Sequence, residues 1–126
     1  MVQSLNKTVD LVKDGTSYMG LADYGKIMVG DAGFEFYNGR DASKYIQIPW
    51  EEIDVVVASV MFKGKWIPRY AIHTKRNGCF TFASKEPKTV LRTIRNYLDG
   101  SQMVQSLSFF EIVNRAFMKR KQVEEA

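Results

Sequence analysis

The chain has 126 residues, of which 45% are hydrophobic and 25% charged, and its net charge is +4. This length and composition predict one globular domain that needs no disulfide or metal to hold its core, and they exclude a disordered or collagen-like chain. The single cysteine, Cys79, excludes an internal disulfide framework, and no apolar run is long enough to span a membrane. No export signal is visible, so we expect a cytoplasmic protein.

The first two-thirds of the chain is predicted to form β-strands. Residues 26–29 and 34–37 flank a short segment, 30–33, whose two glycines can adopt the positive φ that a tight hairpin loop requires. A third strand over 45–48 is expected to end at Pro49, because proline cannot donate a hydrogen bond to a neighbouring strand.

Three further strands follow, over 53–62, 66–74 and 79–83. For the last hairpin we predict a three-residue loop with Gly78 in the left-handed conformation. This register gathers one apolar face for burial, and a two-residue loop would split that face. The residues that it places together are Ile72, Thr74, Phe80 and Phe82.

Apolar residues then recur at helical spacing, which predicts a helix over 87–98 that ends at Asp99-Gly100. A second, amphipathic helix is predicted over 108–121, where Ser108 and Glu111 form a capping-box pattern. Its broad apolar face either packs on its own domain or docks outward on a membrane or a second copy. The docking residues would be Phe109, Phe110, Val113 and Phe117.

Antiparallel hairpins followed by helices predict an α+β, mainly β domain. We expect a sandwich or partly open barrel of six to seven strands, closed by the helix over 87–98. No parallel crossover is expected, because no helix-length segment separates the strands. Residues 1–100 would form this unit, and 101–126 a linker and the additional helix of the same domain.

Charge is unevenly distributed along the chain. Residues 1–54 hold five Lys/Arg and nine Asp/Glu, whereas 55–85 hold six Lys/Arg and no acidic residue. Such a block is a candidate surface for an anion, a phosphate or an acidic partner, although a solvated hairpin face has the same composition. The candidate anion- or partner-binding residues are Lys63, Lys65, Trp66, Arg69, Lys75 and Arg76.

Catalytic and metal-binding patterns are not found. The sequence has no glycine-rich phosphate loop, and its one histidine and one cysteine leave too few ligands for a typical metal site. His73 and Cys79 could form a nucleophile–base pair, but the predicted register sets them diagonally, roughly 7–8 Å apart. We therefore predict no catalytic residues, no cofactor and no metal, and interpret the chain as not being an enzyme.

Six segments carry a resemblance to one bacterial family. They are VQSLN (2–6), YGKIM (24–28), FEFYN (34–38), YIQIPWEEI (45–53), VASVMFKGKWIPR (57–69) and SLSFF (106–110). Over roughly residues 1–118 the chain resembles the domain-of-unknown-function 956 family, also called ManO. The order of Ile48-Pro49, Ile53, two hairpins and a closing helix is also similar to GRAM and pleckstrin-homology-like domains.

The resemblance implies an accessory or regulatory protein of the mannose-class sugar phosphotransferase system, encoded beside its permease. Its partners would be permease components or an acidic membrane surface, and the terminal helix could mediate self-association. GRAM and pleckstrin-homology-like domains are mostly adaptors, which agrees with a role in binding. The alternative is a direct nucleic-acid-binding regulator of the mannose operon, which the acidic first half of the chain disfavours.

Overall fold

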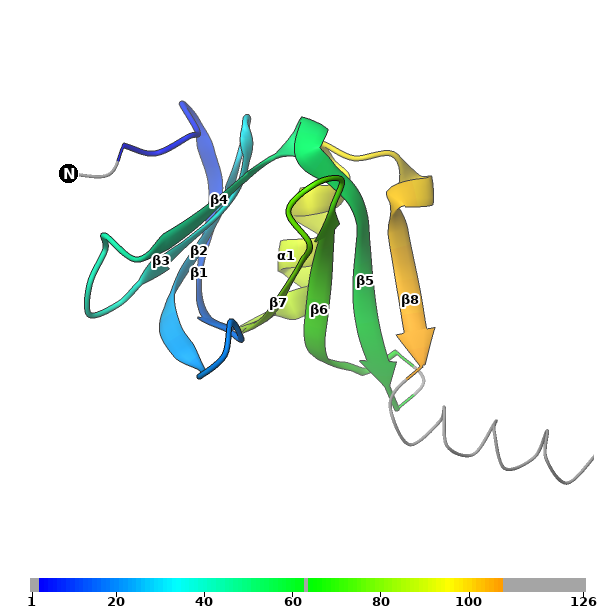
Figure 1. The fold of residues 1–126 in the computed structure, drawn as a ribbon. Helices are drawn as coiled ribbons and strands as arrows, with labels where there is room; N and C mark the ends of the chain where they lie inside the picture. Colours follow the sequence, from blue (N-terminus) through cyan, green and yellow to red (C-terminus); the bar gives the residue numbers. More distant parts are fainter. Residues whose placement is uncertain (1–2, 63, 108–126) are drawn as a thin grey trace, which may run out of the picture.

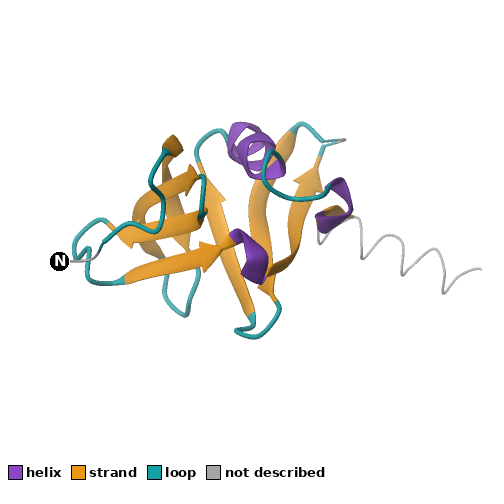
Figure 2. Cartoon of the chain, turned by 90° about the horizontal axis from the view of Figure 1, so that it is seen from above, coloured by secondary structure: helices purple, strands orange, loops and turns teal. Residues whose placement is uncertain are grey.

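The computed structural model describes residues 3–62 and 64–107, which form eight strands, one α-helix and two short 3-10 helices (Figure 1). The sheet lies on both sides of the helix in the view of Figure 2. The elements in chain order are β1 (Val9–Ser17), β2 (Asp23–Gly30), β3 (Gly33–Asn38), β4 (Tyr45–Pro49), η1 (Trp50–Glu52), β5 (Ile53–Met61), β6 (Trp66–Thr74), β7 (Cys79–Ser84), α1 (Pro87–Arg95), η2 (Gly100–Gln102) and β8 (Met103–Leu107).

All eight strands belong to one open sheet with the order β4-β3-β2-β1-β7-β6-β5-β8. β1 pairs with both β2 and β7 and so joins two antiparallel halves. β8 pairs with β5 in parallel, because β6, β7 and α1 together return the chain to the same end of the sheet. The mainly β prediction is confirmed. The strand number of six to seven and the exclusion of a parallel connection are wrong.

β1 was not predicted, because apolar and polar residues do not alternate along its sequence. Its inward-facing positions include Lys13, Gly15 and Ser17, of which only Ser17 is fully buried. Gly15 is required there, because an added Cβ would lie 2.4 Å from the side chain of Ile27. Backbone pairing on both edges, together with this close approach, stabilises the strand in place of buried side chains.

The predicted helix is confirmed as α1, although it ends at Arg95 and not at 98. The segment after residue 100 is not a linker, since it forms η2 and β8. Asp99 caps η2 by accepting from the Ser101 amide, and Gln102 donates to the Ile53 carbonyl, which fixes the start of β8 beside β5. The second predicted helix, over 108–121, lies outside the described residues.

The two glycine predictions had different outcomes. Gly78 is left-handed, with φ of +81°, and Ile72 and Phe80 share one face, as expected. The predicted three-residue loop is wrong, because four residues, 75–78, separate β6 from β7, and Ile72 pairs with Phe80. Gly30 and Gly33 do not have positive φ. They are needed for close packing, because a Cβ would lie 2.3 Å from the Thr8 carbonyl oxygen at Gly30 and 2.4 Å from the Ile48 oxygen at Gly33.

Aromatic side chains form the centre of the core between the two halves of the sheet. The ring of Phe82 lies 4.8 Å from Phe34 and 6.0 Å from Phe36, measured between centroids. α1 covers this cluster with Val90, Leu91 and Ile94. Trp50 stacks on Tyr97 at 5.0 Å and donates to the Gly30 carbonyl, which ties the β4–β5 junction to the end of the helical region.

A carboxylate is buried within the first half of the sheet. Glu35 on β3 has no exposed surface, and no described cation pairs with it. Its oxygens instead accept hydrogen bonds from neutral donors: the Ser4 hydroxyl at 2.6 Å, the Asn6 amide side chain at 2.7 Å, the Leu5 backbone N–H and the Gln47 side chain each at 3.1 Å, and the Tyr37 hydroxyl. The segment before β1 is therefore held over β3 by this one side chain.

The hydrogen bonds also decide the ionisation of Glu35. Burial by itself raises the pKa of the carboxyl, but the bonds from Ser4, Tyr37 and the Leu5 amide outweigh it and hold the pKa below the ordinary value of 4.5. Glu35 is thus ionised in the folded protein at neutral pH. The same contact raises the pKa of Tyr37, because burial and the adjacent carboxylate both disfavour the phenolate.

The variant Glu35→Gln should lower the free energy of unfolding by about 3 kcal/mol. The glutamine amide nitrogen would face hydrogen-bond donors, and the lost hydrogen bonds to a charged group contribute about 1.5–3 kcal/mol each. Urea denaturation of the full chain measures this change. The exposed Glu51→Gln is the matched control and should stay within about 0.5 kcal/mol. An equal effect of both variants would contradict the role of Glu35.

The stability difference between the parent and Glu35→Gln should depend on pH. Because the folded-state pKa lies below the unfolded one, the contribution of Glu35 is fully present above the ordinary carboxyl pKa and is lost as pH falls through the folded value. We expect the difference in urea midpoint to be largest at neutral pH and to shrink below about pH 4.5. A difference that grows on acidification would contradict the ionised assignment.

Candidate functional site

The hairpin between β5 and β6 exposes two large aromatic side chains. We call Phe62, Lys65 and Trp66 the hairpin tip. The Phe62 and Trp66 rings stack with centroids 6.0 Å apart, although 65% of Phe62 and 50% of Trp66 remain accessible to solvent. The structure therefore places both rings at the surface.

Local backbone geometry produces this exposure. β5 has an irregularity between Ser59 and Met61, after which Met61 pairs with Trp66. Phe62 then adopts a left-handed conformation with φ of 54°, and Gly64 follows with φ of +86°. The Lys65 amide donates to the Phe62 carbonyl at 3.2 Å and closes the turn. A phenylalanine in a conformation that favours glycine is strained, and such strain often accompanies function.

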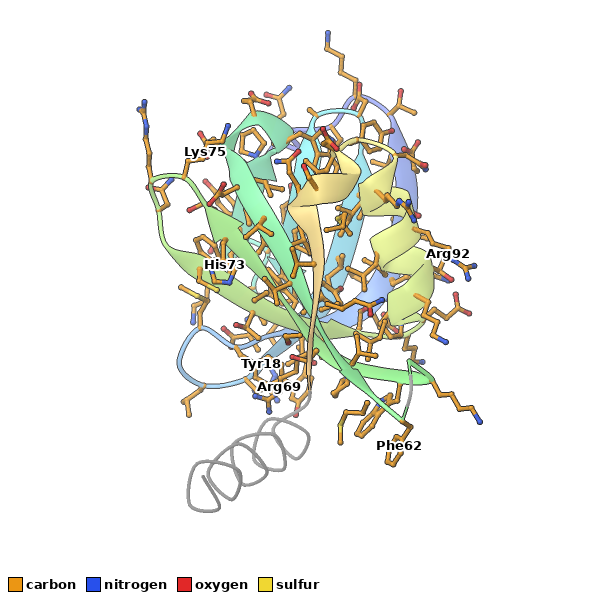
Figure 3. All side chains as sticks on the ribbon, turned by 90° about the vertical axis from the view of Figure 1, so that its right-hand side faces the viewer. Tyr18, Phe62, Arg69, His73, Lys75 and Arg92 are labelled. Atoms are coloured by element: carbon orange, nitrogen blue, oxygen red, sulfur yellow. The ribbon has the colours of Figure 1, made fainter. Side chains whose placement is uncertain are left out.

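The other predicted cations that the structure describes, Arg69, Lys75 and Arg76, do not gather at this tip. Arg69 is exposed and its guanidinium lies over the Tyr18 ring, 4.4 Å from the centroid, on the opposite face of the sheet from α1 (Figure 3). Lys75 and Arg76 lie at the other end of β6, a strand of nine residues and thus about 26 Å long. The predicted basic block is therefore divided among three places.

Lys75 and Arg76 have acidic neighbours that the linear sequence conceals. They line one hollow of about 510 Å³ together with Glu51, Glu52 and Asn77, and the Lys75 amide donates to the Glu52 carbonyl at 2.9 Å. Nearby carboxylates weaken the attraction of these two cations for an external anion. Lys63 and the four predicted docking residues of the terminal helix lie outside the described residues.

His73 and Cys79 are closer than predicted. They are direct cross-strand partners, not diagonal neighbours, because the register is shifted by two residues from the predicted one, in which His73 pairs with Thr81. The Cys79 sulfur lies 3.7 Å from His73 Nε2, and Cys79 is exposed. Among the hydrogen bonds of the described residues, no carboxylate orients either side chain. The third group that a nucleophile–base pair usually needs is therefore not among these contacts.

A basic groove is the feature that sequence analysis missed. Three cations of α1 border it, Lys88, Arg92 and Arg95, and all three are exposed. Its volume is about 480 Å³, within the usual range for ligand sites. The signal is present in the spacing i, i+4, i+7, which places the three on one side of a helix.

Within residues 3–62 and 64–107, no three His, Cys, Asp or Glu side chains are grouped so that they could hold a metal ion. None of the described helices has the length and apolar character needed to cross a membrane.

The described structure is a mainly β domain with one helix, an exposed aromatic hairpin tip and a basic groove. The model of the family "Domain of unknown function (DUF956)" matches residues 1–117, and the chain belongs to this family. No curated protein matches it. Among solved structures, the C-terminal domain of an unknown protein from Leishmania infantum is similar, with a TM-score of 0.63 and 12% identity, over 71% of this chain and 83% of that one. This likeness concerns the fold alone.

The variant Phe62→Gly should not destabilise the protein, although it removes a large side chain in contact with Trp66. Glycine relieves the left-handed strain, worth about 1 kcal/mol, which offsets the lost stacking. Urea denaturation should give an unfolding free energy equal to that of the parent or up to about 1 kcal/mol higher. A loss above about 1 kcal/mol would show that Phe62 is held for stability.

Proposed function

We propose that this chain is a non-enzymatic, cytoplasmic accessory protein of the mannose-class sugar phosphotransferase system, and that it regulates this system by docking on a permease component through the hairpin tip. The observation that carries the proposal is the stacked, exposed pair Phe62 and Trp66 beside Lys65. Large aromatic side chains are typical anchors of protein interfaces. The system itself is inferred from the family resemblance.

The fold proposal follows from the order of elements. Two antiparallel runs that meet at β1 and are closed by α1 support a GRAM or pleckstrin-homology-like domain, to which β8 adds a strand. Proteins of this architecture mostly act as adaptors. Because a shared fold does not determine function, the functional proposal is based on the hairpin tip.

Direct regulation by nucleic-acid binding has less support. A polyanion would need a continuous basic surface, whereas Arg69 stacks on Tyr18 and Lys75 and Arg76 share a hollow with Glu51 and Glu52. The hairpin tip is better suited to a compact contact in which two rings are buried and one ammonium group meets a carboxylate.

The double variant Phe62→Ser, Trp66→Ser should strongly weaken docking on the permease. Immobilised full-length protein is incubated with detergent extracts of cells that contain or lack the mannose-class permease, and retained permease components are quantified. We expect at least a tenfold loss of retention, since an aromatic anchor contributes about 2 kcal/mol or more. Tyr24→Ser is the control, because Tyr24 is 75% exposed but lies on β2.

Two further binding assays distinguish the permease from a membrane surface and from nucleic acid as the partner. Vesicles of acidic and neutral phospholipid without permease test membrane docking, and operator DNA at low salt tests the nucleic-acid alternative. Equal retention by the parent and the double variant would overturn the proposed role of the tip. Binding to acidic vesicles alone would replace the permease with the membrane surface, and tight, salt-sensitive DNA binding would replace both.

A further inference from the structure

The helix α1 does not cover the whole inner face of the sheet. Its main contacts are with β1, β2, β6 and β7, whereas β5 and β8 lie at the sheet edge. The basic groove lies in this position, between α1 on one side and β8 on the other (Figure 3). Its floor is apolar and comes from Val56, Ala58, Val60, Ile67, Leu91 and Met103.

Part of this floor is available to a partner. Val56 and Ala58 are buried, but Val60, Ile67 and Met103 pack against the core while remaining partly exposed. An apolar strip of the sheet beside α1 is thus only partly covered, and it forms the floor of a groove of about 480 Å³. Contiguous apolar surface bordered by polar groups is typical of an interaction site.

The charge along the groove has one sign. Lys88, Arg92 and Arg95 border it, and none of the described residues that line it is acidic. None of the three takes part in the ion pairs formed among the described residues, which involve Lys13, Lys26 and Lys85 instead. The cations of α1 are therefore available to an anionic occupant, in contrast to Lys75 and Arg76 with their acidic neighbours.

We propose that the basic groove binds an amphipathic helix with an acidic stripe, supplied by a partner protein. A helix laid beside α1 would place apolar side chains on Val60, Ile67 and Met103 and its acidic side chains against the cations. Lys88 and Arg95 are seven residues apart, about 10 Å along the helix axis, and acidic residues at i, i+4 and i+7 repeat this spacing. Helix-in-groove binding uses the same apolar periodicity.

The chain's own C-terminal segment is a poorer occupant. Residues 108–126 begin where β8 ends and are long enough to reach the groove, but they hold four Lys/Arg against three Asp/Glu. Three of those basic residues, Lys119, Arg120 and Lys121, are consecutive. Like charges facing one another across an interface are unfavourable, so the cations of α1 favour an acidic partner over this segment.

The test uses a designed probe, an 18-residue fluorescein-labelled peptide of Leu, Ala and Glu with Glu at i, i+4 and i+7 and Leu on the opposite stripe. Fluorescence anisotropy with the full chain should show saturable binding that weakens with salt. A scrambled peptide of equal composition should bind at least tenfold more weakly. Arg92→Glu should reduce affinity at least tenfold, and Arg40→Glu, exposed in the β3–β4 connection, should leave it unchanged.

Several outcomes would overturn the inference: no saturable binding, equal binding of the scrambled peptide, or an Arg92→Glu affinity equal to the parent's. If Arg92→Glu fails to fold, as judged by its urea midpoint, Arg92→Gln replaces it and a threefold loss is expected. Tighter peptide binding by Phe110→Asp, Phe117→Asp would assign the groove to the chain's own terminal segment. The hairpin-tip double variant should bind the peptide normally, so this inference and the proposed function can fail separately.

Discussion

A single buried carboxylate governs how the N-terminal half of this domain is assembled. Glu35 is fully enclosed without a described cation, so its charge is tolerated only because the segment from Ser4 to Asn6, with Tyr37 and Gln47, donates to it. Asn6 also accepts from the Gly33 amide, which links the same contact to the β2–β3 hairpin. Gly30 and Gly33 are required nearby, because only a residue without Cβ lets these backbone segments approach so closely.

The second half of the domain is organised by β1 and α1. β1 pairs with β7 as well as β2, so the sheet bends around the aromatic cluster of Phe34, Phe82 and Tyr70. α1 covers that cluster and makes its main contacts with β1, β2, β6 and β7. The basic groove is thus a direct consequence of having one described helix over a sheet that extends beyond it.

The net charge of each surface region in this protein depends on which residues become neighbours in the folded structure. A block without acidic residues, 55–85, loses its uniform character once Lys75 and Arg76 meet Glu51 and Glu52 and Lys85 meets Asp14. The cations of α1 come from a segment of mixed charge, yet within residues 3–62 and 64–107 no acidic side chain lines the groove that they border. The aromatic tip and the basic groove are two candidate binding surfaces, which adjoin at Gly64 of the hairpin loop.

The sequence by itself determined the local features: a mainly β chain, most of the strands, the helix at Pro87, the left-handed Gly78 and membership of a family recognisable from short motifs. Each depends on periodicity or on one residue's backbone preference. Only the tertiary structure decided that polar β1 lies at the centre of the sheet, that β8 runs parallel to β5, that His73 faces Cys79, and that the cations of α1 border a groove. These depend on pairing and packing between residues far apart in the chain, which leave no periodic signal in any one segment.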